Sequence, residues 1–458
     1  MSTQQKQSNV VKAVRGTRDL MPPETALWNR IEAKAREVFA RYGFGEIRTP
    51  VFEATELFAR GVGEETDIVS KEMYTWEDGD RAPREPQAGG LEARREKPHS
   101  LTLRPENTAG VVRAYIEHKL GESGQLQKLY YIGPQFRRER PQRGRYRQFW
   151  QIGVEVLGPV SSGSESPVRD AEVLEMLATL LDELGVKNWR LELNSVGSSE
   201  DRRRYGAVLR EALAGVKDRM CEDNRRRAET NPLRVLDSKE PADQEIINAL
   251  PKIADYLGED SRAHFEAVLA ALDACGVPYA VNPRLVRGLD YYTRTTFEFT
   301  VPDGSGLGTQ NALLGGGRYD GLSEMLGGPK APGIGFAIGE DRLILVLQEQ
   351  DGREGVNAPH PEWMWAQKLD AYIAPMGVER NAAALALARE LRRAGLSVEV
   401  GNGSFRLKKS FEAADRVARH IVILGEDEVA TSTATVKTFA TGEQTKVPQV
   451  DLAAHLQQ

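Results

Sequence analysis

A dense basic segment at residues 137–147 carries the strongest chemical signal in this chain of 458 residues. It reads RRERPQRGRYR and lies between two predicted strands. Arginine supplies planar, permanently charged donors that suit phosphate, and so many of them would repel one another without an anionic partner. A run of charged residues usually forms a solvent-exposed hairpin tip, but this pattern favours a phosphate site.

The strand that follows, FWQIGVE at residues 149–155, places four different groups on one face. Because side chains alternate along a strand, Phe149, Gln151, Gly153 and Glu155 point the same way. That face offers an aromatic plane, an amide, a gap and a carboxylate, which together could bind a ligand. An amphipathic strand with its polar face in water explains the segment equally well when it is considered alone.

Three further segments combine glycine with charged and aromatic residues: RGLDYY at 287–292, GGGRYD at 315–320 and GIGFAIGEDR at 333–342. Glycine at every second strand position leaves one face bare, which would let a flat ligand approach the backbone. The glycines form neither a Walker A nor a Rossmann fingerprint, since no GK[ST] follows and no βαβ unit surrounds them.

The elements that must position these residues are predicted to form an antiparallel sheet with helices beside it. The apolar spacing predicts a long helix from Glu24 to Tyr42, and a short strand follows at 46–51. Further along, a helix with Pro105 in its first turn precedes two strands, 128–136 and 147–156, on either side of the basic segment.

Changes in composition divide the rest of the chain. Residues 77–100 are polar and predict a loop, and residues 199 to about 275 are almost wholly helical in pattern, which predicts an inserted subdomain. The first 350 residues are therefore assigned to one domain, 351–366 to a linker, and 367–458, where strands and helices alternate, to a small α/β domain.

Bulk properties exclude several classes of protein. The sequence has no apolar run of the roughly 20 residues that cross a bilayer, and its first residues lack an apolar signal-peptide core, so we expect a cytoplasmic protein without membrane contact. Two distant cysteines, Cys221 and Cys275, predict neither a disulfide nor a zinc site, and no other metal site is expected. The net charge of −6 argues against indiscriminate binding of nucleic acid.

Taken together, the motifs resemble those of the histidyl-tRNA synthetases over nearly the whole chain. RGTRDLMP opens the sequence, and three segments resemble motifs 1 to 3 of class II synthetases: GFGEIRTPVFE, FRRERPQRGRYRQFWQIGVE and GIGFAIGEDRL. ETNPLRVLDSK also occurs in the family's order. The two segments that identify the amino acid as histidine are LVRGLDYYTRTTFEF and GGGRYDGL.

The resemblance implies an α+β fold, in which the class II antiparallel sheet is flanked by helices and carries a helical insertion and a C-terminal α/β anticodon-binding domain. It also implies ligation of L-histidine to tRNA(His) through a histidyl-adenylate, with ATP and Mg²⁺ as a substrate complex, by a homodimer. A neutral imidazole presents one donor and one acceptor, which a carboxylate and a phenol can satisfy.

Individual roles follow from the matching positions. The implied catalytic cations are Arg287, between the histidine carboxylate and the α-phosphate, and Arg137, on the α-phosphate. ATP is expected to contact Arg137, Glu139, Phe149 and Arg342. The resemblance implies that histidine is held by Glu106, Thr108, Gln151, Glu155, Arg287, Tyr291, Tyr292 and Tyr319.

Contacts with tRNA are expected in two places. Arg140 and Gln142, in the loop of motif 2, are expected at the acceptor end. The anticodon stem-loop is expected to meet basic residues of the C-terminal domain, namely Arg406, Lys408, Lys409, Arg416 and Arg419.

Three positions depart from the family: Trp150 stands where histidine is common, Asp341 where glutamate is common, and Asn107 where glycine is frequent. Trp150 alternates away from the ligand face, so we expect it to pack. A regulatory paralogue without catalytic activity is the main alternative, but such paralogues lack the anticodon-binding domain and erode LVRGLDYY. A generic nucleotide-binding module would not explain the order of the segments.

Overall fold

The computed structural model describes residues 11–63, 66–78, 99–286, 291–302, 307, 311–350 and 368–457. Arg287, most of the predicted loop at 77–100 and the predicted linker at 351–366 lie outside the described residues. The chain divides into two compact units, one of residues 1–20 with 27–358 and one of residues 359–458 with 21–26.

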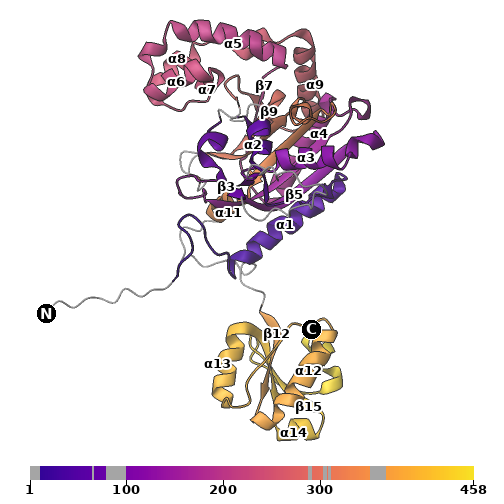
Figure 1. Cartoon of the computed structure of the whole chain (residues 1–458). Coiled ribbons are helices and arrows are strands. Elements are labelled where there is room, and N and C mark those ends of the chain that lie inside the picture. The colour runs from indigo at the N-terminus through magenta and orange to yellow at the C-terminus, as the bar shows by residue number, and fades with distance from the viewer. Residues whose placement is uncertain are drawn as a thin grey trace, which may run out of the picture. The chain divides into compact units, whose positions relative to one another are not determined.

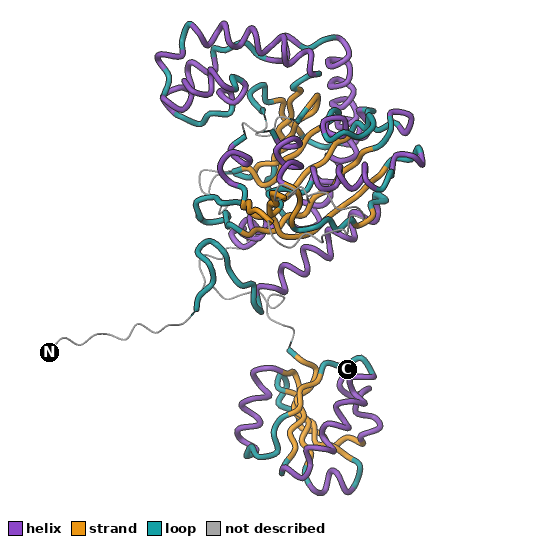
Figure 2. The backbone as a smooth tube through the Cα atoms, in the orientation of Figure 1, coloured by secondary structure: helices purple, strands orange, loops and turns teal. Residues whose placement is uncertain are grey.

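An eight-stranded sheet forms the centre of the larger unit (Figures 1 and 2). Its six middle strands are antiparallel, whereas the two edge strands, β1 and β8, pair in parallel. In spatial order the strands are β1 (Gly45–Glu46), β5 (Gln127–Phe136), β6 (Gln148–Leu157), β11 (Gly333–Gly339), β10 (Ala312–Arg318), β9 (Thr293–Thr300), β7 (Arg190–Ser195) and β8 (Tyr279–Val281).

The long N-terminal helix α1 (Glu24–Arg41) packs on the face of this sheet opposite the predicted site. Its buried residues include Leu27, Ile31 and Phe39, at the predicted helical spacing. The Phe39 ring lies 5.2 Å from that of Tyr130 on β5. A second helix, α4 (Pro167–Leu184), begins after the N-cap Ser166 with proline at its first position.

A three-stranded sheet and several short helices complete the core of this unit. The strands, in spatial order, are β2 (Phe52–Ala54), β4 (His99–Leu103) and β3 (Tyr74–Asp78). The helices are α2 (Thr55–Val62), the π-helical η1 (Ile68–Glu72), α3 (Thr108–Glu117), η2 (Leu120–Ser123), η3 (Val160–Ser162), α10 (Leu322–Met325) and α11 (Glu340–Gln350).

Two predicted boundaries in this region are wrong. Helix α3 begins at Thr108 rather than at Pro105, because the Glu106 carboxylate caps it by accepting the backbone N–H groups of Thr108 at 2.8 Å and Ala109 at 3.0 Å. The strand predicted at 46–51 is paired only at Gly45–Glu46. Arg104 instead donates to the backbone oxygen of Thr49 at 3.0 Å, which removes that carbonyl from strand pairing.

The predicted helical insertion lies between β7 and β8, where Figure 1 shows α5 to α8 as a lobe beyond the sheet. Its core includes Tyr205, Leu209 and Ile253, all fully buried. The last helix, α9, packs against α4 and so joins the lobe to the sheet. The elements are α5 (Ser199–Ala214), η4 (Lys217–Arg219), α6 (Glu222–Thr230), α7 (Leu233–Leu236), η5 (Pro241–Asp243), α8 (Gln244–Asn248), η6 (Ile253–Tyr256) and α9 (Glu259–Cys275).

The smaller unit is an α/β domain built on a five-stranded sheet. Its strands are, in spatial order, β13 (Val398–Val400), β12 (Leu369–Pro375), β14 (Ala418–Leu424), β15 (Thr433–Thr438) and β16 (Gln444–Pro448); the first three are parallel. The helices are η7 (Val378–Arg380), α12 (Asn381–Arg393), α13 (Leu407–Val417), α14 (Glu426–Ala430), η8 (Gln449–Asp451) and α15 (Leu452–Leu456). The α+β class and the α/β character of the C-terminal part are thus confirmed.

Candidate functional site

Strand β6 carries the predicted ligand face. It pairs with β5 on one side and β11 on the other, so this face lies in the middle of the large sheet. Phe149 and Gln151 line a cavity at the start of the strand, and Glu155 is fully buried near its end. The predicted alternation therefore holds along the whole segment.

The cavity at the start of β6 has a volume of about 170 Å³. The guanidinium of Arg137 lies 5.2 Å above the Phe149 ring, and its Nε donates to the backbone oxygen of Pro105 at 2.9 Å. All four predicted ATP-binding residues are brought together here. The complete lining is Arg137, Glu139, Gly144, Arg145, Tyr146, Phe149, Gln151, Gly339, Asp341 and Arg342.

The charges of this cavity favour an anion. Three arginines, Arg137, Arg145 and Arg342, face two carboxylates, Glu139 and Asp341. Burial lowers the pKa of Arg342, and the neighbouring charge of Arg145 lowers it further. Because a guanidinium stays protonated at neutral pH, a phosphate group in the cavity would relieve this repulsion.

A second group of predicted residues surrounds Glu155. Its carboxylate accepts hydrogen bonds from the Thr108 hydroxyl and from the Tyr319 hydroxyl, each at 2.6 Å. Tyr291 is buried beside them, with its ring 4.9 Å from that of Tyr292 and 6.0 Å from that of Tyr319. The predicted histidine-binding residues Thr108, Glu155, Tyr291, Tyr292 and Tyr319 thus form one buried cluster.

Glu106 and Gln151 are the other predicted histidine-binding residues that the structure describes. Glu106 is buried at the start of α3, and its negative charge adds to the raised pKa of Glu155. Gln151 is also buried, and its side-chain oxygen accepts no hydrogen bond from the described residues. A buried acceptor of this kind is available to a ligand donor.

The sequence suggested that the glycines of β10 and β11 leave one face of the sheet bare for a ligand. In the structure that face is filled. A side chain at Gly335 would collide with the Glu155 carboxylate, and a Cβ at Gly317 would come within 2.8 Å of the Tyr292 ring. The missing side chains therefore make room for the pocket's own acid and tyrosine.

One residue of this cluster was missed from the sequence. Tyr131, on β5, is buried opposite Gly153, and its hydroxyl has no hydrogen-bond partner in the part of the chain that the structure describes. Burial raises the pKa of Tyr131 well above its usual value, and the charge of Glu155 adds to this shift. The only sign of Tyr131 in the sequence was Gly153, which leaves space for a large side chain on the neighbouring strand. The pairing of β5 with β6 had to be known before that space could be assigned to Tyr131.

The residues predicted to bind tRNA are exposed. Arg140 and Gln142 lie in the loop between β5 and β6, where the backbone of Gln142 pairs with that of Arg145. In the smaller unit, Arg406, Lys408, Lys409, Arg416 and Arg419 are exposed on and beside α13. Lys409 covers the Phe405 ring at 3.9 Å.

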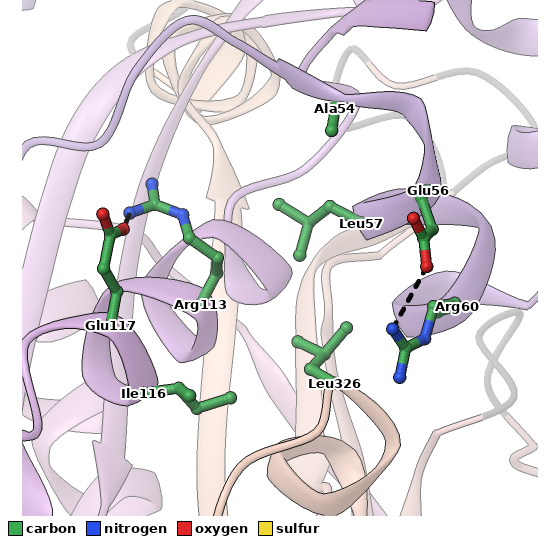
Figure 3. A pocket seen from close by; sticks show the side chains of 8 residues that line it. All are labelled: Ala54, Glu56, Leu57, Arg60, Arg113, Ile116, Glu117 and Leu326. Atoms are coloured by element: carbon green, nitrogen blue, oxygen red, sulfur yellow. Dashed lines mark hydrogen bonds and ion pairs between the residues drawn. The ribbon is translucent and has the colours of Figure 1, made fainter. Parts of the chain in front are cut away.

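A larger cavity of about 300 Å³ contains none of the predicted residues (Figure 3). It has apolar walls, including Leu57 and Leu326, between α2, α3 and α10. Its charged residues are already paired, since Arg60 contacts Glu56 at 3.2 Å and Arg113 contacts Glu117 at 2.7 Å. The cavity thus lacks the convergent polar groups of the site on β6.

Stability should fall as pH rises, because two buried acids resist ionisation. Burial raises the pKa of Glu155 to about 8 and that of Glu340 to about 9. Both acids are protonated in either state below pH ~4.5, so their contribution to stability is greatest there. That contribution is lost as pH rises from the unfolded-state value up to the folded-state values, because the unfolded chain ionises first.

Between pH 6 and pH 7, each acid should lower the free energy of unfolding by about 1.4 kcal/mol. Urea unfolding of the ligand-free protein at several pH values measures this slope. Glu155→Gln and Glu340→Gln should each make it shallower, and slopes equal to that of the unchanged protein would rule out this origin.

Two family descriptions match the chain. The histidyl-tRNA synthetase family matches residues 94–343, and the anticodon binding domain matches residues 370–458. Histidine–tRNA ligase of Koribacter versatilis is 64% identical over 448 residues, which are 98% of this chain and 96% of that protein. Histidine–tRNA ligase of Solibacter usitatus is 52% identical over 98% of this chain and 99% of its own length.

The fold also matches a solved structure. The crystal structure of apo S. aureus histidyl-tRNA synthetase superposes with a TM-score of 0.77 at 36% identity, covering 98% of this chain and 100% of the other. The similarity to the two ligases extends over both units, and the buried acid, the tyrosines and the arginine-lined cavity lie within the matched ranges. The chain belongs to the histidyl-tRNA synthetase family.

Proposed function

We propose that this chain ligates L-histidine to tRNA(His), with ATP consumed through a histidyl-adenylate intermediate. The observation that carries the proposal is the arrangement of two sites on strand β6. The arginine-lined cavity, which Phe149 also lines, is at the start of the strand. The buried Glu155, which accepts hydrogen bonds from Thr108 and Tyr319, lies near the end of the strand. A nucleotide and an amino acid bound there would be aligned along one strand.

In the proposed first step, the histidine carboxylate attacks the α-phosphate of ATP and releases pyrophosphate. Arg137 holds the α-phosphate, while Phe149 stacks on the adenine and Glu139 contacts its edge. Arg342 lies near the other face of the adenine and the γ-phosphate. Mg²⁺ enters with ATP, held chiefly by the phosphates. Positioning and cationic stabilisation, rather than a covalent nucleophile, accelerate the step.

Histidine is proposed to bind in the buried cluster. Glu106, Thr108 and Gln151 hold the α-amino group, and Glu155 and Tyr292 satisfy the two imidazole nitrogens, which present one donor and one acceptor. Tyr319 closes the pocket, and Tyr291 is also proposed to contact histidine. Arg287 is proposed, from the sequence alone, to bridge the histidine carboxylate and the α-phosphate. In the second step, the 3′-hydroxyl of the terminal adenosine of the tRNA attacks the acyl group.

ATP–pyrophosphate exchange, with each amino acid offered separately, tests this function. Exchange should occur with histidine alone, because a buried site made of polar partners strongly rejects amino acids that leave those partners unpaired. Exchange with a different amino acid would replace the proposed substrate. No exchange at all would favour a regulatory protein.

The loop between β5 and β6 is proposed to meet the acceptor end of the tRNA through Arg140 and Gln142. Arg140→Ala should therefore slow aminoacylation by about tenfold while leaving pyrophosphate exchange nearly unchanged. The matched control is Arg143→Ala in the same loop, since Arg143 is already paired with Glu349 at 3.4 Å. Equal losses in the two assays would remove Arg140 from tRNA recognition.

A homodimer is proposed through the segment that resembles motif 1. Its support is an apolar surface that includes the end of this segment, where Val51, Phe52 and Trp76 are exposed and the last two rings lie 6.1 Å apart. Such an interface would be isologous and large. Light scattering at micromolar concentration should give twice the mass of the chain, and a monomer alone would contradict the assignment.

The remaining assignments concern the domains and their surroundings. We propose residues 1–350 as the catalytic domain, with the insertion at about 199–275, and 351–366 as a linker. Residues 367–458 are proposed to bind the anticodon stem-loop through the basic residues around α13. Among the described residues, no helix is long and apolar enough to cross a membrane, and a cytoplasmic location is proposed.

A further inference from the structure

The N-terminal RGTRD segment lies against the loop of the nucleotide cavity. Arg147 donates its backbone N–H to the Gly16 oxygen at 2.7 Å, and its guanidinium donates to the Arg15 oxygen at 3.1 Å. Gly16 has a φ of +90°, and a Cβ there would come within 2.7 Å of Pro141. The close approach therefore requires glycine at this position. The two hydrogen bonds from Arg147 hold residues 15–16 against the end of the loop.

Arg18 extends from this segment to two residues that line the cavity. Its Nη2 lies 2.9 Å from Asp341 Oδ1, and its guanidinium stacks on the Tyr146 ring at 4.8 Å. Tyr146 belongs to the loop between β5 and β6, whereas Asp341 belongs to α11. One side chain thus joins two walls of the cavity that are far apart in the sequence.

Asp341 needs a cation in this position. Its side chain is only 6% exposed, and its second oxygen accepts the backbone N–H of Trp150 at 3.3 Å. A buried carboxylate that loses its cationic partner is strongly unfavourable. Without Arg18, the negative charge of Asp341 would act instead on the arginines that line the same cavity, including Arg342, which follows it in the chain.

We propose that Arg18 is a positioning residue of the nucleotide site. It neutralises Asp341 and holds Tyr146 in place, so that the cavity arginines remain directed toward the phosphates of ATP. This inference rests on the proposed function of the cavity. The RGTRD segment would therefore orient the residues of the nucleotide site without contacting the nucleotide, since Arg18 itself does not line the cavity.

The test compares Arg18→Ala with Arg15→Ala in ATP–pyrophosphate exchange. The control removes the same charge from the same segment but keeps the Arg15 backbone oxygen that Arg147 uses. Arg18→Ala should raise KM for ATP about tenfold, equivalent to about 1.4 kcal/mol, and change KM for histidine less than twofold. Arg15→Ala should change neither value, and Arg18→Lys should recover part of the loss.

A double variant examines whether Arg18 acts through Asp341. If it does, Arg18→Ala combined with Asp341→Asn should be no worse than Arg18→Ala alone, because the carboxylate charge that Arg18 neutralised is gone. Additive losses would overturn the inference. So would equal rises in the two KM values accompanied by a lower melting temperature, which would indicate general destabilisation. Failure of the unchanged protein to exchange with histidine would instead overturn the proposed function.

Discussion

Replacing Arg137 by alanine is expected to slow formation of histidyl-adenylate by about 10² to 10³, the usual cost of removing one preorganised donor from a developing charge. The Arg137 guanidinium is held over Phe149 at 5.2 Å and anchored to the Pro105 oxygen at 2.9 Å. It therefore needs little rearrangement to meet a phosphate in the cavity. Pyrophosphate exchange measures the loss directly.

The neighbouring arginine provides the control. Arg138 stacks on Tyr74 at 5.8 Å and does not line the cavity, although its replacement removes the same charge one residue away. Arg138→Ala should retain most of the rate. Transfer of histidine from preformed adenylate should be much less affected in Arg137→Ala than adenylate formation is. A similar loss in both variants would show that only the overall positive charge of the loop matters.

Arg318→Met is expected to destabilise the catalytic unit by about 3–5 kcal/mol, because it leaves a buried carboxylate without its cation. Arg318 and Asp170 are both fully buried, and Arg318 Nη1 lies 2.5 Å from Asp170 Oδ1. Burial by itself lowers the pKa of Arg318, but the carboxylates of Asp170 and Asp320 outweigh it and raise that pKa. The Arg318 guanidinium is thus held in its charged form.

Urea unfolding of two further variants identifies the cause. Arg318→Met combined with Asp170→Leu removes both charges and should recover most of the lost stability, since an apolar pair of similar volume often replaces a buried ion pair at little cost. Arg226→Ala breaks an exposed pair with Asp223 at 3.0 Å and should cost less than about 1 kcal/mol. If the double variant is as unstable as Arg318→Met, the lost packing of Arg318, not the unpaired charge, is responsible.

Local patterns in the sequence were sufficient to predict much of the candidate site. The alternation from Phe149 to Glu155 gave the ligand face, because a strand fixes which side chains share a side. The helix from Glu24 ends at Arg41, one residue before its predicted end, since the spacing of apolar residues specifies a helix and its buried side. These features depend only on residues that are near one another in the chain.

Contacts between distant segments could not be predicted in this way. Arg318 and Asp170 are 148 residues apart, and Arg18 and Asp341 are 323 residues apart. Each pair looks like ordinary surface charge in the sequence, and only the packing of the elements brings its two partners together. The start of α3 was missed for a different, local reason, because the Glu106 side chain caps the backbone two and three residues further on, and the helix begins after it rather than at the proline.

In the proposed function, strand β6 sets a fixed distance between the nucleotide site and the histidine site. Gln151 lines the nucleotide cavity, and Glu155 lies four residues further on, about 14 Å along an extended backbone. This spacing is set by covalent geometry and by the strands on either side, not by the side chains themselves. If the proposed function holds, exchanging side chains at the Glu155 end would change which amino acid is selected and would leave the distance to the attacked phosphate unchanged.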